Sequence, residues 1–342
     1  MADTKKEHYV PRCYLKNFTS DTDKVFVFDK WKQESRKQKI MDVAMENYFY
    51  DIDFTELINQ AENSETIKSD LINIVEGNSW DDVLVHLDPK HMEKSFLAPL
   101  EKVYSELLKL LIEKSYGGNK WIIENCRCCS ENEKLLMSFF IAIQLIRTKH
   151  FRETVSDTIE KTLQALINKG LIYNSVQGEE HSEIVVESNK DFVKLQHSQM
   201  MLDAETTINI AETLNDHIWV MYIIRDNDKV FYTSDNPIAR IPHIKNQYIS
   251  YSGLKSKGIE ILFPVTPKML LGMYDRETYE KAFSDRMFMA VESDEQIDYF
   301  NRALIAYSYR CLFSQTDDFS LAYKMCKEFP DLQERPNLVS VG

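Results

Sequence analysis

Two short motifs, far apart in the chain, hold the residues best suited to chemistry. Residues 8–12 read HYVPR and combine a histidine, His8, with a permanent cation, Arg12. Imidazole titrates near neutral pH, so His8 could move protons or bind a metal, and a guanidinium such as Arg12 suits an anion. In the structural alternative, His8 caps a turn and Arg12 pairs with a buried acid. The sequence leaves both interpretations open.

The second motif, residues 233–237, reads TSDNP and follows a predicted strand. Strand ends often carry functional side chains, and there Asp235 could project into a cleft as a metal ligand or a base. Asn236 precedes a proline, which favours extended backbone at that position. However, short polar side chains at a strand end also bond well to nearby backbone. That second account explains the composition equally well.

A helical stretch supplies a third group of polar residues. Gln144 and Arg147 are three positions apart and therefore share one face of a helix that is apolar nearly all round. A buried amide or guanidinium needs a partner, and Glu101, on another apolar helix, is the obvious one. The pair predicts a buried strut between Glu101 and Arg147, with Gln144 bonded to a loop carbonyl, or a polar pocket shared with both motifs, and the two are compatible.

Together these residues predict a metal-assisted hydrolase that acts on a phosphodiester or a nucleotide. The residues with a predicted catalytic role are His8, Arg12, Gln144, Arg147 and Asn236. Glu101 and Asp235 are the predicted ligands of a divalent ion, Mg²⁺ or Mn²⁺. In the alternative hypothesis, the same side chains form the polar pocket of a non-enzymatic sensor or protein-interaction module.

The acidic balance of the chain bears on its partners. The 342 residues include 54 acidic and 41 basic side chains, a formal net charge of −13. This disfavours passive binding to duplex DNA or to an anionic membrane, but an enzyme with a local basic cleft could still act on nucleic acid. The most basic stretch, Lys30–Lys39, is either a solvated hairpin face or a nucleic-acid contact. The acidic surface would suit a basic protein partner, and a homo-oligomer is a further expectation.

The hydropathy pattern predicts a cytoplasmic protein without membrane association. Residues 1–10 lack the apolar core of a secretory signal. The longest strongly apolar stretch, Leu135–Ile146, is too short to span a bilayer and is typical of a buried helix.

The periodicity predicts helices in the middle of the chain and strands toward its ends. Helical spacing covers Thr55–Gly77, Ser95–Lys114, a helix that Ser130 caps and that runs to about Lys169 before Gly170, and Asn189–Asn215. Strand patterns cover Lys24–Asp29, Gly258–Phe263, Met269–Tyr274 and Cys311–Ser314. Trp219–Ile224 and Lys229–Thr233 flank a polar turn and predict a β-hairpin. Two late helices are expected at Glu292–Tyr309 and Leu321–Glu328.

This order of elements predicts an α+β fold rather than alternating βαβ units. We expect a central helical block, residues 55–215, and a small mixed or antiparallel sheet built from N-terminal and C-terminal strands. We expect residues 1–315 to form a single domain, followed by a C-terminal helix and tail at 316–342.

Three motifs give the chain a family resemblance. Residues 8–18 read HYVPRCYLKNF, residues 233–237 read TSDNP, and residues 263–267 read FPVTP. Together with Glu46–Asp51, the Gln144, Arg147 and Thr148 segment and a late Asn301, they resemble the bacterial domain-of-unknown-function family 4238. The likeness runs from about Glu7 to Ser314. It implies no particular activity, and the genomic setting of such proteins implies a defence or stress role.

Overall fold

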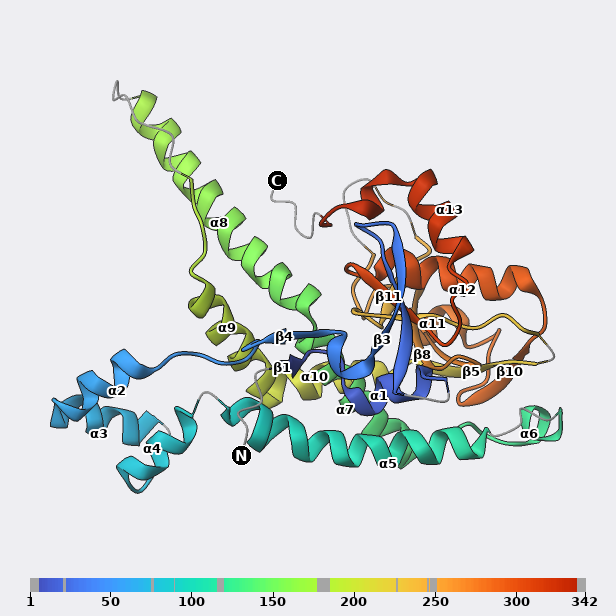
Figure 1. The fold of residues 1–342 in the computed structure, drawn as a ribbon, viewed down its shortest axis with the longest axis horizontal. Coiled ribbons are helices and arrows are strands. Elements are labelled where there is room, and N and C mark those ends of the chain that lie inside the picture. The colour runs from blue at the N-terminus through green and yellow to red at the C-terminus, as the bar shows by residue number, and fades with distance from the viewer. Residues whose placement is uncertain are drawn as a thin grey trace.

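The structure is a computed structural model of the whole chain. It describes residues 6–20, 23–74, 77–88, 90–115, 120–176, 185–225, 227–244, 246 and 251–336. Figure 1 shows two sheets gathered at one end of the molecule, and helices that extend away from them toward the other end.

The N-terminal segment forms two antiparallel strand pairs. Strands β1 (Lys6–His8) and β4 (Met45–Asn47) pair with each other, and β2 (Lys24–Asp29) pairs with β3 (Glu34–Lys39). Between them lie α1 (Arg12–Leu15) and two 3₁₀ turns, Lys16–Phe18 and Ile40–Asp42. β2 and β3 belong to a four-stranded antiparallel sheet of order β3-β2-β11-β6. In this sheet, β11 is Cys311–Ser314 and β6 is Thr233–Ser234. The expected sheet of N-terminal and C-terminal strands is therefore present.

The middle of the chain is helical, as predicted. Its helices are α2 (Thr55–Glu62), α3 (Glu65–Ile74), α4 (Trp80–His86), α5 (Ala98–Lys114), α6 (Lys120–Asn125), α7 (Glu131–Arg147), α8 (Lys149–Val176), α9 (Lys190–Leu202) and α10 (Ala204–Asp216). A π-helical turn, Met92–Leu97, leads into α5. α2 to α4 and the far end of α8 project away from the sheets, whereas α5 and α7 lie against them (Figure 1).

Helix ends show where local signals were sufficient. Ser130 caps α7 as predicted, because its hydroxyl accepts from Glu133 N–H (3.2 Å) and Glu133 Oε2 accepts from Ser130 N–H (2.7 Å). The helix then breaks at Thr148, whose backbone is extended. The following helix does not end before Gly170 but continues to Val176. The helix predicted from Thr55 is divided into α2 and α3.

A second sheet has five strands in the order β10-β5-β9-β8-β7. The bounds are β5 Ile218–Ile224, β7 Ala239–Pro242, β8 Ile259–Thr266, β9 Met269–Tyr274 and β10 Met287–Val291. β5 pairs antiparallel with β9 and parallel with β10. The hairpin predicted from β5 is therefore wrong, since its partners β9 and β10 lie about fifty and about seventy residues downstream and residues 233–234 join the other sheet.

Alternation along β5 explains why this sheet is buried on both faces. Trp219, Met221 and Ile223 face the main core shared with α5 and α7, whereas Val220 and Tyr222 face a second core under α12 (Asp294–Tyr307). Successive strand side chains point to opposite faces, so an all-apolar strand needs cover on both. Helices α11 (Arg276–Tyr279) and α13 (Ser320–Glu328) and the 3₁₀ turn Pro330–Gln333 complete the fold, which is α+β as expected.

The described part of the chain contains no helix with the length and apolar character needed to cross a membrane.

Candidate functional site

The first motif is clamped from behind by α7. Arg147 Nη2 donates to His8 O at 2.6 Å, and Gln144 Nε2 donates to Tyr9 O at 3.2 Å. Arg147 also pairs with Glu101 Oε1 of α5 at 3.0 Å. Both α7 side chains are buried. The strut between Glu101 and Arg147 is therefore present, and Gln144 satisfies a loop carbonyl.

The motifs also bond to one another. The Tyr14 hydroxyl donates to Pro264 O at 2.7 Å and accepts from Thr233 Oγ1 at 2.6 Å. Asn17 Nδ2 reaches Val265 O at 3.5 Å. One buried tyrosine thus joins the start of the chain, the TSDNP segment and the FPVTP segment. This contact gives the three motifs a shared structural purpose.

On its other side, Glu101 faces an open cavity of about 1000 Å³. The walls come from α1, the π-helical turn, α5, and the ends of β2 and β3. Six basic side chains line it, namely Arg12, Lys16, Lys24, Lys39, Lys102 and Lys109. Four acidic ones accompany them, Asp23, Glu93, Glu101 and Glu106. The cavity is therefore net basic in a chain whose net charge is −13.

Glu93 is the most unusual of these residues. It lies on the π-helical turn, a rare element that often occurs at functional sites. Its Oε2 is buried and has no hydrogen-bond partner among the described residues. Burial raises the pKa of Glu93, and Glu101 adds to the rise while Arg147 opposes it. A buried carboxylate oxygen without a hydrogen bond is costly, and this one lies beside the basic cavity, which makes Glu93 a candidate site residue.

His8 lies behind the cavity wall rather than in it. Its neighbours include Ile40 and Met41, which line the cavity, but His8 itself is only 7% exposed. Burial, followed by the charges of Arg12 and Arg147, lowers the pKa of His8 to about 4. The imidazole is therefore neutral at physiological pH and a weak base. Its geometry favours a structural role over the predicted proton transfer.

Asp235 and Asn236 belong to a different network. Asp235 Oδ1 accepts from Tyr309 N–H at 2.9 Å, and Oδ2 accepts from Arg310 N–H (2.9 Å) and Cys311 N–H (2.8 Å). Asn236 Nδ2 donates to Tyr307 O at 2.8 Å. The two side chains thus hold the segment that leads into β11. Burial raises the pKa of Asp235 to about 6, against the three backbone N–H groups and Lys30.

The predicted metal pair is therefore not assembled. Glu101 lines the basic cavity, whereas Asp235 is 3% exposed, is absent from that lining and has both oxygens bonded to backbone. Within the described ranges, no group of three or more His, Cys, Asp or Glu side chains is placed to hold a metal ion. Of the predicted residues, Arg12 and Glu101 line the cavity, Arg147 is buried behind it and pairs with Glu101, and Asp235 and Asn236 lie elsewhere.

Sequence reasoning missed Glu93 and the lysines of the cavity, except that Lys39 ends the basic stretch singled out above. One weak signal was present for Glu93, because it is eight residues before Glu101, a spacing that falls within one broad helix stripe. The sequence has no comparable signal for the π-helical turn on which Glu93 lies.

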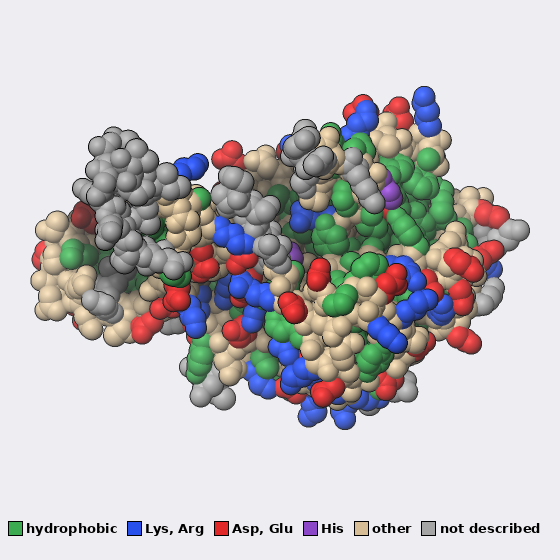
Figure 2. Space-filling model, turned by 90° about the horizontal axis from the view of Figure 1, so that it is seen from above, with side chains coloured by type: hydrophobic (Ala, Val, Ile, Leu, Met, Phe, Trp, Pro, Cys, Tyr) green, Lys and Arg blue, Asp and Glu red, His purple; other side chains and the backbone are tan. Residues whose placement is uncertain are grey.

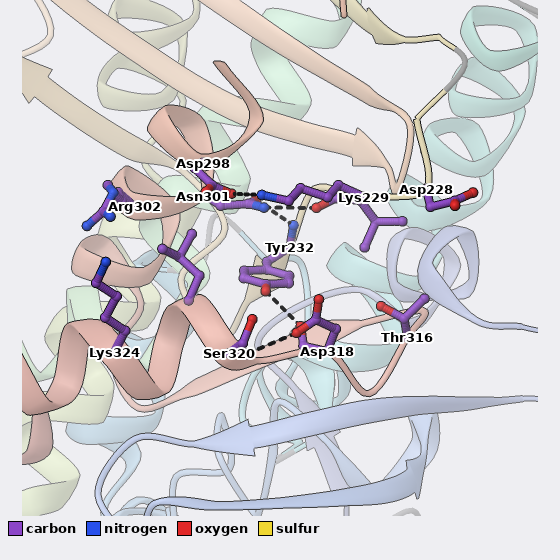
Figure 3. Close-up of a pocket in the computed structure, with 12 residues that line it drawn as sticks. Asp228, Lys229, Tyr232, Asp298, Asn301, Arg302, Thr316, Asp318, Ser320 and Lys324 are labelled. Carbon is purple, nitrogen blue, oxygen red and sulfur yellow. Dashed lines mark hydrogen bonds and ion pairs between the residues drawn. The ribbon is translucent and has the colours of Figure 1, made fainter. Parts of the chain in front are cut away.

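A second hollow, of about 390 Å³, lies between α12 and α13 (Figure 3). Asn301 lies on one side of it, where its Oδ1 accepts from Tyr232 N–H (3.0 Å) and its Nδ2 donates to Val230 O (2.9 Å). Lys229 pairs with Asp298 at 2.8 Å, and Tyr232 Oη donates to Asp318 O at 2.7 Å. These groups satisfy one another, as the dashed lines show, so the late Asn301 stabilises the chain around it.

Comparison with known proteins bears on the family alone. A family model described as "protein of unknown function (DUF4238)" matches residues 6–318. The chain belongs to this family. No curated protein and no solved structure matches it. The family membership expected from the three motifs is confirmed.

Proposed function

We propose that the basic cavity binds a phosphate-bearing ligand, a nucleotide or the end of a nucleic acid strand, and that Glu93 and Glu101 assist its hydrolysis. The observation that carries the proposal is the coexistence of six basic side chains with a buried, unpaired carboxylate oxygen in one cavity. A volume of about 1000 Å³ accommodates a nucleotide-sized ligand.

The basic side chains would bind the ligand through its phosphates. Arg12 is exposed on α1 and presents a guanidinium, which suits phosphate oxygens in a bidentate arrangement. Lys102 and Lys109 lie seven residues apart on α5 and so reach the cavity from one helix face. Arg147 is already engaged by Glu101 and His8, so its part is to orient Glu101.

The carboxylates would supply the chemistry. The pKa of Glu93 is raised toward neutral pH. A carboxylate with a raised pKa is a stronger base and accepts a proton from an attacking water more readily. Mg²⁺ in phosphoryl sites is commonly held by one or two carboxylates and the ligand's own phosphates. Glu93 and Glu101 fit this requirement, and a divalent ion would add charge stabilisation for the phosphoryl group.

A second candidate is a sensor that binds the same ligand without turnover. It is favoured by the engagement of Arg147 with a backbone carbonyl, since that guanidinium is not free to follow a reacting phosphate. We further propose that the protein acts in a defence or stress response, as the family resemblance implies.

The test measures binding and product formation separately. Purified protein would be titrated by calorimetry with nucleotides and short RNA and DNA strands, in Mg²⁺, Mn²⁺ or EDTA, while chromatography follows products. Lys102→Glu should weaken binding at least tenfold. Lys327→Glu, at an exposed helical lysine outside the cavity, is the matched control and should not.

Glu93→Gln separates the two candidates. For the hydrolase, it should abolish turnover, keep binding, and leave the melting temperature unchanged or raised, because an unpaired buried charge is removed. Ligand binding by the unmodified protein without any product would support the sensor. Absence of both binding and product across the panel would reject the phosphate-binding proposal.

A further inference from the structure

A third hollow, of about 430 Å³, is built mostly from aromatic rings. It lies on the face of the five-stranded sheet that packs under α12, opposite the main core. Six rings line it: Tyr222, Tyr274, Tyr279, Phe283, Tyr299 and Phe300. In Figure 2, hydrophobic side chains gather on the half of the molecule that carries these elements, with a histidine among them.

One buried carboxylate occupies the floor of this hollow. Glu260 of β8 is 3% exposed, and its Oε1 accepts from the Tyr274 hydroxyl at 2.8 Å. Its Oε2 accepts from the Tyr299 hydroxyl (2.6 Å) and bonds to His243 Nε2 (2.8 Å). Burial, reinforced by Glu260, raises the pKa of both tyrosines, so their hydroxyls remain protonated donors. Among the described residues, no lysine or arginine forms an ion pair with Glu260.

Several of the rings around this carboxylate stand at steep angles to one another, whereas Tyr279 and Phe283 are nearly parallel, 6.1 Å apart at 18°. Tyr222 and Tyr274 are 6.5 Å apart at 72°, Tyr274 and Tyr279 are 5.2 Å apart at 59°, and their two neighbours on α12, Tyr299 and Phe300, are 5.4 Å apart at 69°. Such angles make walls rather than a flat stack. The hollow therefore offers ring faces and edges around a negative centre.

A glycine permits the close approach of the first two rings. A Cβ at Gly272 of β9 would lie 2.8 Å from Tyr222 Cε2 and 2.8 Å from Tyr274 Cε2. Any side chain there would displace these rings. The absence of a side chain at Gly272 therefore allows Tyr222 and Tyr274 to approach each other over β9.

We propose that this hollow binds a small organic cation through a methylated ammonium group, independently of the phosphate site. The ring faces attract a cation by their quadrupoles, and Glu260 supplies the compensating charge. A methylated ammonium is large and weakly hydrated, so it enters an apolar hollow at low desolvation cost. Mg²⁺ or Ca²⁺ would need six or more oxygen ligands, whereas the described lining offers two carboxylates, Glu260 and Glu295.

The test uses choline chloride as the probe and 3,3-dimethylbutan-1-ol, its uncharged analogue, as the control. Calorimetric titration of the full chain at fixed ionic strength should show saturable binding of choline. The uncharged analogue should bind at least tenfold more weakly, a difference of about 1.4 kcal/mol. Trimethyllysine, tested in parallel, distinguishes a free small molecule from a modified side chain as the source of the group.

Variants at Tyr299 separate the ring from its hydroxyl. Tyr299→Leu removes the ring and should weaken choline binding tenfold or more, whereas Tyr299→Phe keeps the ring and should retain binding. Tyr323→Leu is the matched control, since Tyr323 is 41% exposed and Tyr299 is 42% exposed. Glu260→Gln should also weaken binding, and the Tyr299 variants decide the outcome if that variant does not fold.

Three results would overturn the proposal. They are no saturable binding of either choline or trimethyllysine, equal binding of the uncharged analogue, and equal binding by Tyr299→Leu and the unmodified protein. None of these bears on the phosphate site, whose variants are at other residues.

Discussion

The ion pair between Arg147 and Glu101 allows a quantitative test of which partner the fold depends on. Arg147 is almost completely buried, with its side chain 3% exposed, whereas the Glu101 side chain is 24% exposed toward the cavity. Arg147→Met would remove the 2.6 Å hydrogen bond to His8 O and the ion pair, and would leave His8 O with only a 3.4 Å hydrogen bond from the Tyr50 hydroxyl. A buried acceptor that loses its short hydrogen bond costs about 1–3 kcal/mol, and the lost pair adds about 1 kcal/mol. We therefore expect Arg147→Met to lower the free energy of unfolding by about 3 kcal/mol.

Glu101→Gln should cost much less. The amide oxygen introduced by this substitution can still accept from Arg147, and water from the cavity reaches the position, so we expect a loss of about 1 kcal/mol. In the double variant, the amide at position 101 has no Arg147 guanidinium to bond to. The double variant should therefore lose about 3 kcal/mol rather than the sum of about 4, a coupling energy of about 1 kcal/mol.

The assay is equilibrium unfolding in urea, followed by the fluorescence of the four tryptophans. Arg12→Met, at an exposed position of the same cavity, is the control and should change stability by less than about 0.5 kcal/mol. The reasoning is refuted if Glu101→Gln costs as much as Arg147→Met, or if the two losses simply add.

Three buried groups give further predictions. Asp235→Asn replaces a carboxylate that accepts from three backbone N–H groups with an amide whose nitrogen cannot accept, so the free energy of unfolding should fall by about 3 kcal/mol or more. An unchanged melting temperature would instead favour the predicted role of Asp235 as a site residue. Burial lowers the pKa of His197 from 6.5 to about 3, so the folded state binds fewer protons and loses stability as pH falls below 6.5. Between about pH 6.5 and 5 this amounts to about 2 kcal/mol, and His197→Gln should remove that part of the pH dependence in urea titrations. Gly272→Ala should destabilise by about 1–3 kcal/mol, because its Cβ would collide with Tyr222 and Tyr274; a neutral effect on the urea midpoint would contradict the tight approach of the rings.

Local patterns in the sequence were sufficient for the elements whose neighbours are close along the chain. The bounds of β2, β9 and β11 match the predicted strands, because a short run of apolar or alternating residues is a property of the segment itself. The Ser130 cap was predictable for the same reason, since its partner Glu133 is three residues away. The apolar face of α7 likewise indicated that Gln144 and Arg147 would be buried and would need partners.

Partners at long range were not predictable in the same way. β5 is apolar on both faces, and nothing in its own residues indicates that it pairs with β9 and β10 instead of the next strand. Asp235 and Glu101 both looked like metal ligands, since a carboxylate has the same appearance in the sequence whether it meets backbone amides or a cavity.

The sequence by itself therefore determined the family, the fold class and which polar residues would be buried in apolar helices. Only the tertiary structure decided which polar side chains reach the cavity. It separated Asp235, closed off by three backbone N–H groups, from Glu101, which lines the basic cavity. The physical reason is that periodicity reports the apolar face of each element, whereas water access and hydrogen-bond partners depend on elements that are distant along the chain.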